Sequence, residues 1–392
     1  NNDWLAVTNK IKEIDPGALI SGPNLTQYSN VFMDDFIAFC VEHDCLPNVV
    51  SWHLLWAKAF LQTGPNITAF RALEAKYEPI YLEKYPDRES PFPLKVDINE
   101  YAAQEEIAVG GSLIQYIARY DEQKMNSMLP YWNTANSYGS LLAGQNEPNG
   151  AWWLYKWYAD MIGGDMAKIT VHNARHEDDS EGPGLYGLAS IQDDKKQVAI
   201  AFGGTKGDSK IVFRNVSGHA NSPEFLKDAE QVRVTVWYAG FTGLTGYLVE
   251  PTQIIDRNYP VDNGSVTLTL DIDDYTAAYF AVITPAASSD SREVWFHRYE
   301  AEEADVKTNV TIGNLYPAAS SLRAASNGRI VQGINQADSV VRWTNITVPV
   351  DGSYRLDLIG GSGATASMPN QTNTGNANQR INSEWFIKVD DE

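Results

Sequence analysis

Clusters of polar and aromatic side chains follow four short apolar runs near the start of the sequence. They are Gly22-Pro23-Asn24, Ser51-Trp52-His53, Asn99-Glu100-Tyr101 and Tyr131-Trp132-Asn133. Together they supply one carboxylate, one imidazole, two indoles and several amides. Aromatic rings suit the apolar faces of a sugar, amides suit its hydroxyls, and a carboxylate can act at its anomeric carbon. These residue types therefore predict glycan chemistry.

The segments that must position these side chains alternate between strand-like and helix-like patterns over residues 1–165. Strands are predicted at 18–23, 49–53, 94–100 and 128–133, and helices at 4–14, 31–41, 66–85, 104–120 and 151–162. Such alternation predicts βα units around a parallel sheet. Four strands are half of an eight-stranded (β/α)8 TIM barrel, whose active sites lie at the carboxyl ends of the strands. We therefore expect a partial barrel, with the four clusters at one edge of its sheet.

The rest of the chain has the pattern of β-structure. Short alternating runs separated by Gly, Asn, Asp and Ser predict an accessory all-β sandwich over 166–286. A short linker follows at 287–293, and a third unit with further strand-like segments occupies 294–392. The Trp-rich helix over 151–162 is expected to pack against the sandwich.

The order of the four clusters resembles strands five to eight of retaining glycosidases of the large (β/α)8 clan. S-G-P-N, S-W-H, I-N-E-Y and P-Y-W-N are most similar to successive strands of family 39 glycoside hydrolases, which include β-xylosidases and α-iduronidases. The strand-seven glutamate of that family is its nucleophile, which implies this role for Glu100 in a double-displacement reaction. Asn99 stands where the family has threonine, so the sequence matches the clan more fully than it matches family 39.

The same resemblance implies substrate contacts around Glu100. His53 corresponds to the strand-six histidine of the family, which contacts the substrate or the nucleophile, and Trp132 to the strand-eight ring that floors the first subsite. Further contacts are expected from Trp52, Asn99 and Asn24. Structural alternatives are a Glu100 carboxylate paired with a cation, and packing roles for His53 and Trp132.

The partner of the nucleophile is expected outside this sequence. The acid/base glutamate of the family lies in an N-E-P motif at the end of strand four, which corresponds to a position upstream of Asn1. Asn146-Glu147-Pro148 has the same letters, but it falls in a loop where Pro148 and Asn149 suit a helix start. We therefore expect the C-terminal half of a glycosidase barrel, inactive by itself. The alternative is a non-catalytic glycan-binding or cell-wall-associated protein.

The third unit resembles family 35 and family 6 carbohydrate-binding modules. It opens with Y-E-A-E-E-A from Tyr299, and V-P-V-D-G-S-Y from Val348 is similar to their V-P-x-x-G-x-Y hairpin. The resemblance implies a jelly-roll β-sandwich that is incomplete at Glu392, and a structural Ca2+ held by the oxygens of Glu300 and Glu302. The alternative for these glutamates is a charged edge strand that resists aggregation. No cofactor is expected for catalysis.

The composition of the chain limits which partners it can bind and where in or outside the cell it is expected. The net charge of −20 argues against nucleic acid, which needs a basic surface. The sequence has no run of 18 apolar residues, so no membrane span is expected. An oligosaccharide or polysaccharide is the expected partner, and the oligomeric state stays open. The glycosylation sequons, which favour a secreted extracellular protein, begin at Asn24, Asn66, Asn215, Asn263, Asn309, Asn345 and Asn370.

The two cysteines of the sequence, Cys40 and Cys45, are expected to form a disulfide in an oxidising compartment. Their spacing matches no zinc or redox motif. Residues five apart in a regular helix are too distant to bridge, so the disulfide requires that the helix unwinds before Cys45. Two free thiols are the alternative.

Overall fold

The computed structural model of the protein describes residues 2–103, 106–130, 141–144, 146–172, 182–243, 246–288, 294–314, 326–334, 336 and 338–360. The chain forms two compact units. The first contains 1–106 and 115–130, and the second contains 107–114 and 131–392. Within the described ranges, no helix combines the length and the apolar character that crossing a membrane requires.

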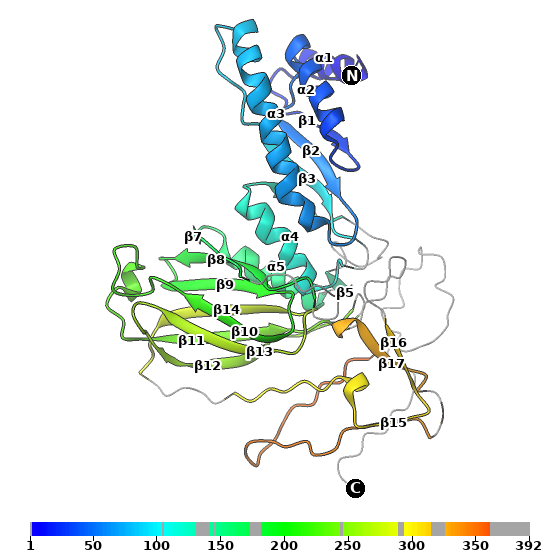
Figure 1. Cartoon of the computed structure of the whole chain (residues 1–392), viewed down its shortest axis with the longest axis vertical. Coiled ribbons are helices and arrows are strands. Elements are labelled where there is room, and N and C mark those ends of the chain that lie inside the picture. Colours follow the sequence, from blue (N-terminus) through cyan, green and yellow to red (C-terminus); the bar gives the residue numbers. More distant parts are fainter. Residues whose placement is uncertain are drawn as a thin grey trace. The chain divides into compact units, whose positions relative to one another are not determined.

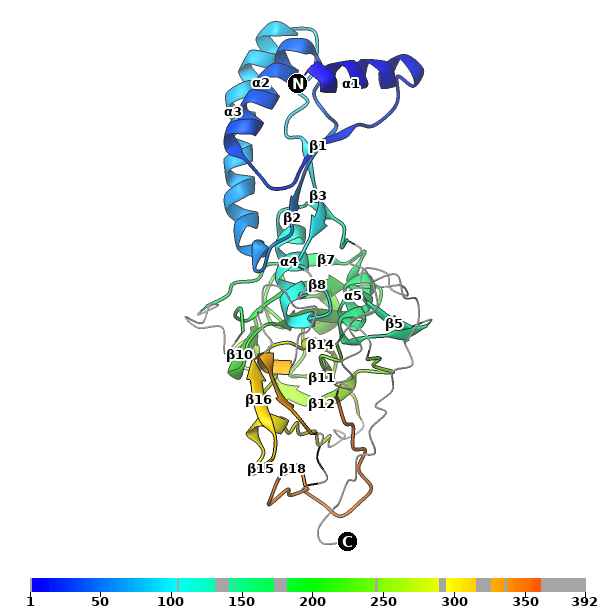
Figure 2. The ribbon, with the colours of Figure 1, turned by 90° about the vertical axis from the view of Figure 1, so that its right-hand side faces the viewer.

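The first unit is built on a parallel four-stranded sheet. Its strands, in spatial order, are β1 (Ser21–Leu25), β2 (Val49–Leu54), β3 (Lys95–Tyr101) and β4 (Asn126–Ser127). Its helices are α1 (Asn2–Ile14), α2 (Asn30–His43), the short η1 (Ala59–Gln62), α3 (Thr63–Lys84) and the C-terminal part of α4 (Gly110–Glu122). Helices α2 and α3 lie side by side along the sheet (Figure 1, Figure 2). The predicted parallel sheet and βα units are therefore confirmed, and the barrel around them stays a prediction.

The fourth strand lies earlier than predicted, and the described residues 128–130 of the predicted range have no regular secondary structure. β4 pairs with β3 at Asn126 and Ser127, just before the predicted start of that strand. Residues 131–133, which carry the expected Trp132 contact, lie outside the described residues.

One face of the sheet is buried against helices because apolar residues alternate along its strands. Val50 and Trp52 of β2 are fully buried. The Trp52 ring packs against Phe70 of α3, with 6.0 Å between the ring centroids. Ser51 and His53 alternate with these residues along β2, so their side chains point to the opposite face of the sheet.

The two cysteines lie where α2 ends. The helix stops at His43 because Asp44 adopts a left-handed conformation, and the N–H of Cys45 donates to the carbonyl oxygen of Cys40 at 3.0 Å. The unwinding that a disulfide requires is therefore present, but both thiols are free and buried, and the predicted disulfide was wrong. Burial raises the pKa of both thiols. They therefore stay protonated and pack as small apolar groups.

The second unit contains the predicted all-β sandwich. One antiparallel sheet has the strand order β12-β11-β14-β9-β8-β7, and the other pairs β10 with β13. The strands are β7 (Asp165–Ala167), β8 (Tyr186–Gln192), β9 (Gln197–Gly203), β10 (Gly207–Phe213), β11 (Gln231–Ala239), β12 (Thr252–Pro260), β13 (Val266–Ile272) and β14 (Ala278–Pro285), with a short helical turn η3 (Glu224–Leu226). The short alternating runs of the sequence lie at 185–191, 197–202, 210–214, 232–238, 266–272 and 279–284. They predict six of these strands, but not β7 or β12.

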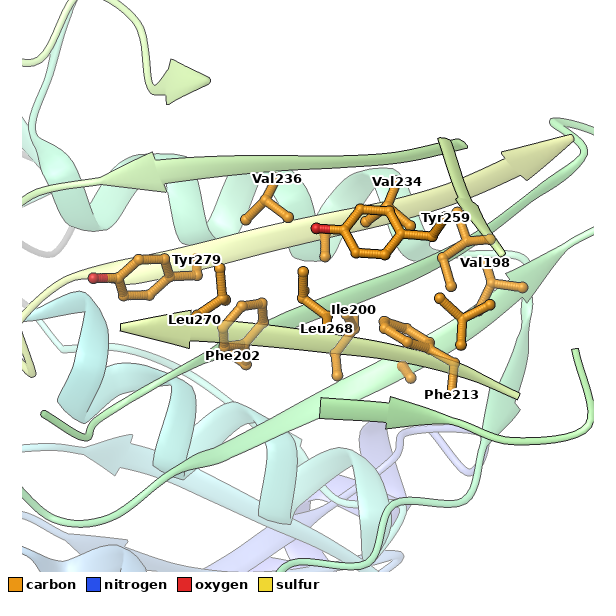
Figure 3. Packing of buried hydrophobic residues seen from close by; sticks show 14 of the residues in the cluster. Val198, Ile200, Phe202, Phe213, Val234, Val236, Tyr259, Leu268, Leu270 and Tyr279 are labelled. Atoms are coloured by element: carbon orange, nitrogen blue, oxygen red, sulfur yellow. The ribbon is translucent and has the colours of Figure 1, made fainter. Parts of the chain in front are cut away.

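The core of the sandwich lies between its two sheets. Figure 3 shows Val234 and Val236 of β11 facing Leu268 and Leu270 of β13 across this core. Burial alternates strictly along β13, with one face on the core and the other exposed. This alternation is the reason the sequence predicts the strand so well.

A Trp-rich helix covers the outer side of the six-stranded sheet. Helix α5 (Gly150–Met161) follows a small hairpin of β5 (Leu142–Gly144) and β6 (Glu147–Pro148). Trp157 of α5 stacks on Phe280 of β14, with the ring centroids 5.2 Å apart and the planes 8° from parallel. The predicted packing of this helix on the sandwich is therefore confirmed.

Residues 294–360 also belong to the second unit. β15 (Val306–Thr308) pairs with β18 (Val340–Arg342), and β16 (Thr311–Asn314) pairs with β17 (Arg329–Gln332), beside the short turns η4 (Ala301–Glu303) and η5 (Ser326–Gly328). The segment 294–299, which the sequence predicts as a strand, has no regular secondary structure. The predicted jelly-roll and the predicted domain boundaries stay predictions.

Candidate active site

The end of β3 carries a bulge that determines where Glu100 points. In the pairing with β2, Ile98 is opposite Trp52 and Glu100 is opposite His53, so Asn99 is an extra residue. Ile98 and Tyr101 are both buried on the helix side of the sheet. Because the extra residue interrupts the alternation, Asn99 and Glu100 both face away from the helices.

The rings of α4 fix this turn of the chain. Tyr101 packs against Tyr116 and Tyr120 of α4, with centroids 5.4 Å and 5.2 Å away. All three rings are buried. A packed ring directly after Glu100 anchors the backbone of the bulge, so the carboxylate is carried by a rigid strand end.

A second bulge lies at the end of β1. Pro23 is opposite Ser51 and Leu25 is opposite Trp52, so Asn24 is the extra residue, at a φ of 58°. Asparagine is one of the few side chains that tolerate this left-handed region. The Oδ1 atom of Asn24 accepts hydrogen bonds from the Ser51 hydroxyl and from Nδ2 of Asn99, the latter at 3.2 Å.

His53 and Glu100 face each other at the same edge of the sheet. Nδ1 of His53 lies 3.5 Å from Oε2 of Glu100, and the two side chains are 16% and 37% exposed. The imidazole can thus orient the carboxylate without covering it. Asp97 lies two residues before Asn99 on the same face of β3, and burial raises the pKa of its carboxyl group.

The structure brings four of the six predicted site residues together. Asn24, His53, Asn99 and Glu100 lie at the carboxyl ends of β1, β2 and β3, as barrel sites require. Trp52 is not among them. Its ring is fully buried on the helix side, because one step along a strand reverses the direction of a side chain. Its substrate contact was a wrong prediction, and Trp132 lies outside the described residues.

The second N-E-P motif has a structural place. Glu147 and Pro148 form β6, and the N–H of Leu248 donates to the carbonyl oxygen of Pro148 at 2.7 Å. Asn149 caps α5, since its Oδ1 accepts from the N–H of Trp152 at 3.1 Å. The predicted helix start at this motif is therefore confirmed.

The residues expected to hold calcium have other partners. Glu300 accepts hydrogen bonds from Arg298 at 2.7 Å, from Ser326 at 3.0 Å and from Asn327 at 3.1 Å, which occupy both carboxylate oxygens. Glu302 is buried, and burial raises the pKa of its carboxyl group. In the part of the chain that the structure describes, no group of three or more His, Cys, Asp or Glu is placed to hold a metal ion. Glu300 and Glu302 therefore do not fit a calcium site.

Sequence analysis missed the buried network to which Glu300 belongs. Arg298 also pairs with Asp274, at 2.8 Å, and the Tyr238 hydroxyl donates to the same carboxylate at 2.9 Å. Arg298 is two residues before Glu300, so the two side chains share one side of an extended segment. That spacing was the available signal, but Asp274 is remote in the sequence.

Curated relatives of the chain are glycosidases. It is 26% identical over 363 residues to a 3-O-alpha-D-galactosyl-alpha-L-arabinofuranosidase of Bifidobacterium longum subsp. longum, a match that covers 90% of this chain and 30% of that protein. It is 25% identical over 375 residues to a 3-O-beta-L-arabinopyranosyl-alpha-L-arabinofuranosidase of Bifidobacterium pseudocatenulatum, covering 90% of this chain and 36% of that protein. The chain therefore spans about a third of the length of these relatives. No family model matches it.

A solved structure from Neocallimastix frontalis has a similar fold. Its TM-score is 0.59 at 25% sequence identity, over 72% of this chain and 64% of that chain. The relatives of the chain are thus glycoside hydrolases of the arabinofuranosidase type. The resemblances to family 39 and to carbohydrate-binding modules stay predictions.

Proposed function

We propose that the protein is a retaining glycoside hydrolase that acts on L-arabinofuranosyl glycans, with Glu100 as its nucleophile. The observation that carries this proposal is the bulged end of β3, which presents an accessible Glu100 carboxylate to His53. Asn99 at the same edge offers an amide group for a sugar hydroxyl. The names of the two curated relatives support the choice of sugar.

The reaction runs in two steps at one carbon. A carboxylate oxygen of Glu100 attacks the anomeric carbon, and the bond to the leaving oxygen breaks as a second carboxyl group protonates that oxygen. Water then attacks the same carbon, gives its proton to the second group and releases Glu100. In retaining enzymes the two carboxyl groups are about 5–5.5 Å apart. The proposal assigns the acid/base role to no described residue.

The nucleophile is tested by Glu100→Gln and by trapping. We expect the variant to lose at least about 10³-fold in kcat on an aryl α-L-arabinofuranoside, because the covalent step disappears. A 2-deoxy-2-fluoro arabinofuranosyl donor should add its mass to the peptide that contains Glu100. Glu147→Gln is the matched control, since Glu147 spells the acid/base motif but lies in β6. Turnover retained in Glu100→Gln and lost in Glu147→Gln would overturn the assignment.

Surface aromatic rings favour glycan binding as a second function. Trp295 and Tyr354 are partly exposed, and their rings meet edge to face at 5.3 Å. They line a hollow together with Pro349, Gly352 and Ser353. Exposed rings beside small polar groups suit the apolar face of a sugar. In a gel that contains arabinan, the native chain should be retarded more than the Trp295→Ala variant. Equal retardation of both proteins contradicts this role.

We also propose that the protein is secreted, on the basis of its glycosylation sequons. Of the six sequons within the described ranges, four have an exposed asparagine at positive φ outside helices and strands: Asn215, Asn263, Asn309 and Asn345. Asn24 also has a positive φ, but it lies in β1. Asn66 lies in the first turn of α3, and Asn370 lies outside the described residues. Peptide mapping of the natively produced protein would detect glycans at the exposed turns, and bare asparagines at all of them would count against a secretory route.

A further inference from the structure

We propose that Asn24 is a positioning residue for the Glu100 site. It acts through Asn99, because one amide oxygen on β1 ties together the ends of three strands. The inference rests on the proposed function for its catalytic consequence, but the tie itself can be tested without turnover.

The geometry of the tie is unusual because it spans a strand. β1 and β3 are not neighbours in the sheet, since β2 lies between them. Asn24 nevertheless reaches Asn99 with 3.2 Å between Oδ1 and Nδ2, while the same Oδ1 accepts from the Ser51 hydroxyl of β2. The backbone ladder of β2 and β3 skips Asn99. The side-chain bond from Asn24 therefore restrains a residue that the ladder of β2 and β3 leaves unpaired.

Loss of the Asn24 amide leaves two donors without their acceptor. Ser51 is fully buried, and a buried hydroxyl without a partner is costly. Asn99 directly precedes Glu100, so a more mobile Asn99 leaves the orientation of the Glu100 carboxylate less well fixed. A loosened nucleophile binds substrate as before but attacks less often, which lowers kcat more than it raises KM.

The left-handed backbone of Asn24 allows a clean deletion. Glycine adopts a φ of 58° without strain, so Asn24→Gly removes the amide and keeps the bulge. Asn24→Asp keeps an acceptor for both donors, but it adds a negative charge close to the charged and titratable groups of this edge, which are Asp97, His53 and Glu100. A nearby like charge disfavours ionisation of a carboxyl group.

Asn48 provides the matched control. Its Oδ1 accepts from the N–H of Ile20 at 2.8 Å, at the amino ends of the same strands. Asn48→Gly therefore removes a side-chain amide that also joins two segments of the sheet, but at the edge opposite Glu100.

The first measurement follows the side-chain NH2 signal of Asn99 in the 392-residue chain labelled with 15N-asparagine. The signal is assigned by its loss in Asn99→Asp. We expect it to move and to exchange faster with solvent in Asn24→Gly, and to keep its position in Asn48→Gly. An Asn99 signal that is unchanged in Asn24→Gly overturns the tie, whatever the activity of the protein.

The second measurement is hydrolysis of an aryl α-L-arabinofuranoside. Asn24→Gly should lower kcat about tenfold or more with KM changed less than about threefold, which corresponds to the loss of one strong hydrogen bond. Asn24→Asp should recover most of kcat and move the acid limb of the pH profile to higher pH. Equal losses in Asn24→Gly and Asn48→Gly, or no rescue by Asp, reduce Asn24 to a structural residue. These kinetics are measured on the full-length protein, whose lack of turnover would refute the proposed function and leave the result on the Asn99 signal standing.

Discussion

Glu100 of the first unit and Glu300 of the second unit are held in opposite ways. The Glu100 side chain is 37% exposed and faces the His53 imidazole at 3.5 Å, longer than a usual hydrogen bond. The Glu300 side chain is 10% exposed and accepts from Arg298, Ser326 and Asn327. Both glutamates carry a predicted role from a sequence motif. Their surroundings agree with only one of those roles.

The difference separates a carboxylate that can act on a ligand from one that holds the chain together. Arg298 is nearly buried, and it joins Glu300 to the fully buried Asp274 in the loop between β13 and β14. The segment around Arg298 is thereby fastened to the sandwich without strand pairing. Three hydrogen bonds use most of the acceptor capacity of the Glu300 carboxylate, whereas the Glu100 carboxylate beside a single imidazole keeps its capacity for a ligand.

The largest expected effect on stability is that of Arg298→Met. It leaves two carboxylates buried without their cation, and breaking a buried ion pair costs about 3–5 kcal/mol. Urea unfolding should show this loss, while Glu100→Gln changes the unfolding free energy by less than about 0.5 kcal/mol. The contrast between the two sites fails if Arg298→Met is tolerated within about 1 kcal/mol, or if Glu100→Gln destabilises as much.

A smaller effect is expected from Asp273, which adjoins the buried network. Burial, together with the charge of Asp274 and against the attraction of Arg298, raises the pKa of Asp273 to about 6. Between about pH 4 and pH 6 the folded chain holds a proton that the unfolded chain has released, so this group makes stability fall as the pH rises through that window. Asp273→Asn should remove this slope and stabilise the protein at pH 7 by at most about 3 kcal/mol.

The measurement compares urea midpoints of the native chain and Asp273→Asn at pH 4, 5, 6 and 7. The two curves should meet at the lowest pH and separate as the pH rises. Parallel curves would mean that burial and the charge of Asp274 do not raise the pKa of Asp273. Water would then reach the network more than the burial of Asp274 indicates.

Much of the fold follows from local patterns. The strict alternation over Val266–Ile272 predicts β13, and the paired runs at 197–202 and 232–238 predict β9 and β11 almost to their ends. β12 escapes such reading because most of its residues are half-buried, so its apolar and polar positions do not alternate. Its place is decided by pairing with β11, a contact that the sequence does not display.

The site is predictable to the extent that strand ends are. Parallel strands bring their carboxyl ends to one edge, which placed Asn24, His53, Asn99 and Glu100 together. Trp52 was misassigned because a strand's sequence alone does not say which face meets the helices, and Val50, Ser51 and Trp52 are all buried. The bulges and the partners of Glu300 depend on tertiary contacts and were beyond sequence reasoning.

The smallest effect is expected from the ion pair of Arg88 and Asp44 at the surface. It tests whether burial or the ion pairing itself makes the Arg298 network stabilising. Arg88 lies 2.5 Å from Asp44, closer than Arg298 to Asp274, but both side chains of that pair are about half exposed. Water stabilises the two separated charges almost as much as the ion pair does, so exposed ion pairs contribute little to the free energy of unfolding. Arg88→Gln should therefore leave the urea midpoint of the first unit unchanged within error, at both low and high salt. A loss of stability comparable with that of Arg298→Met would mean that a short distance alone makes an ion pair stabilising. Glu300 and Glu100 would then differ in their access to a ligand and not in their contribution to stability.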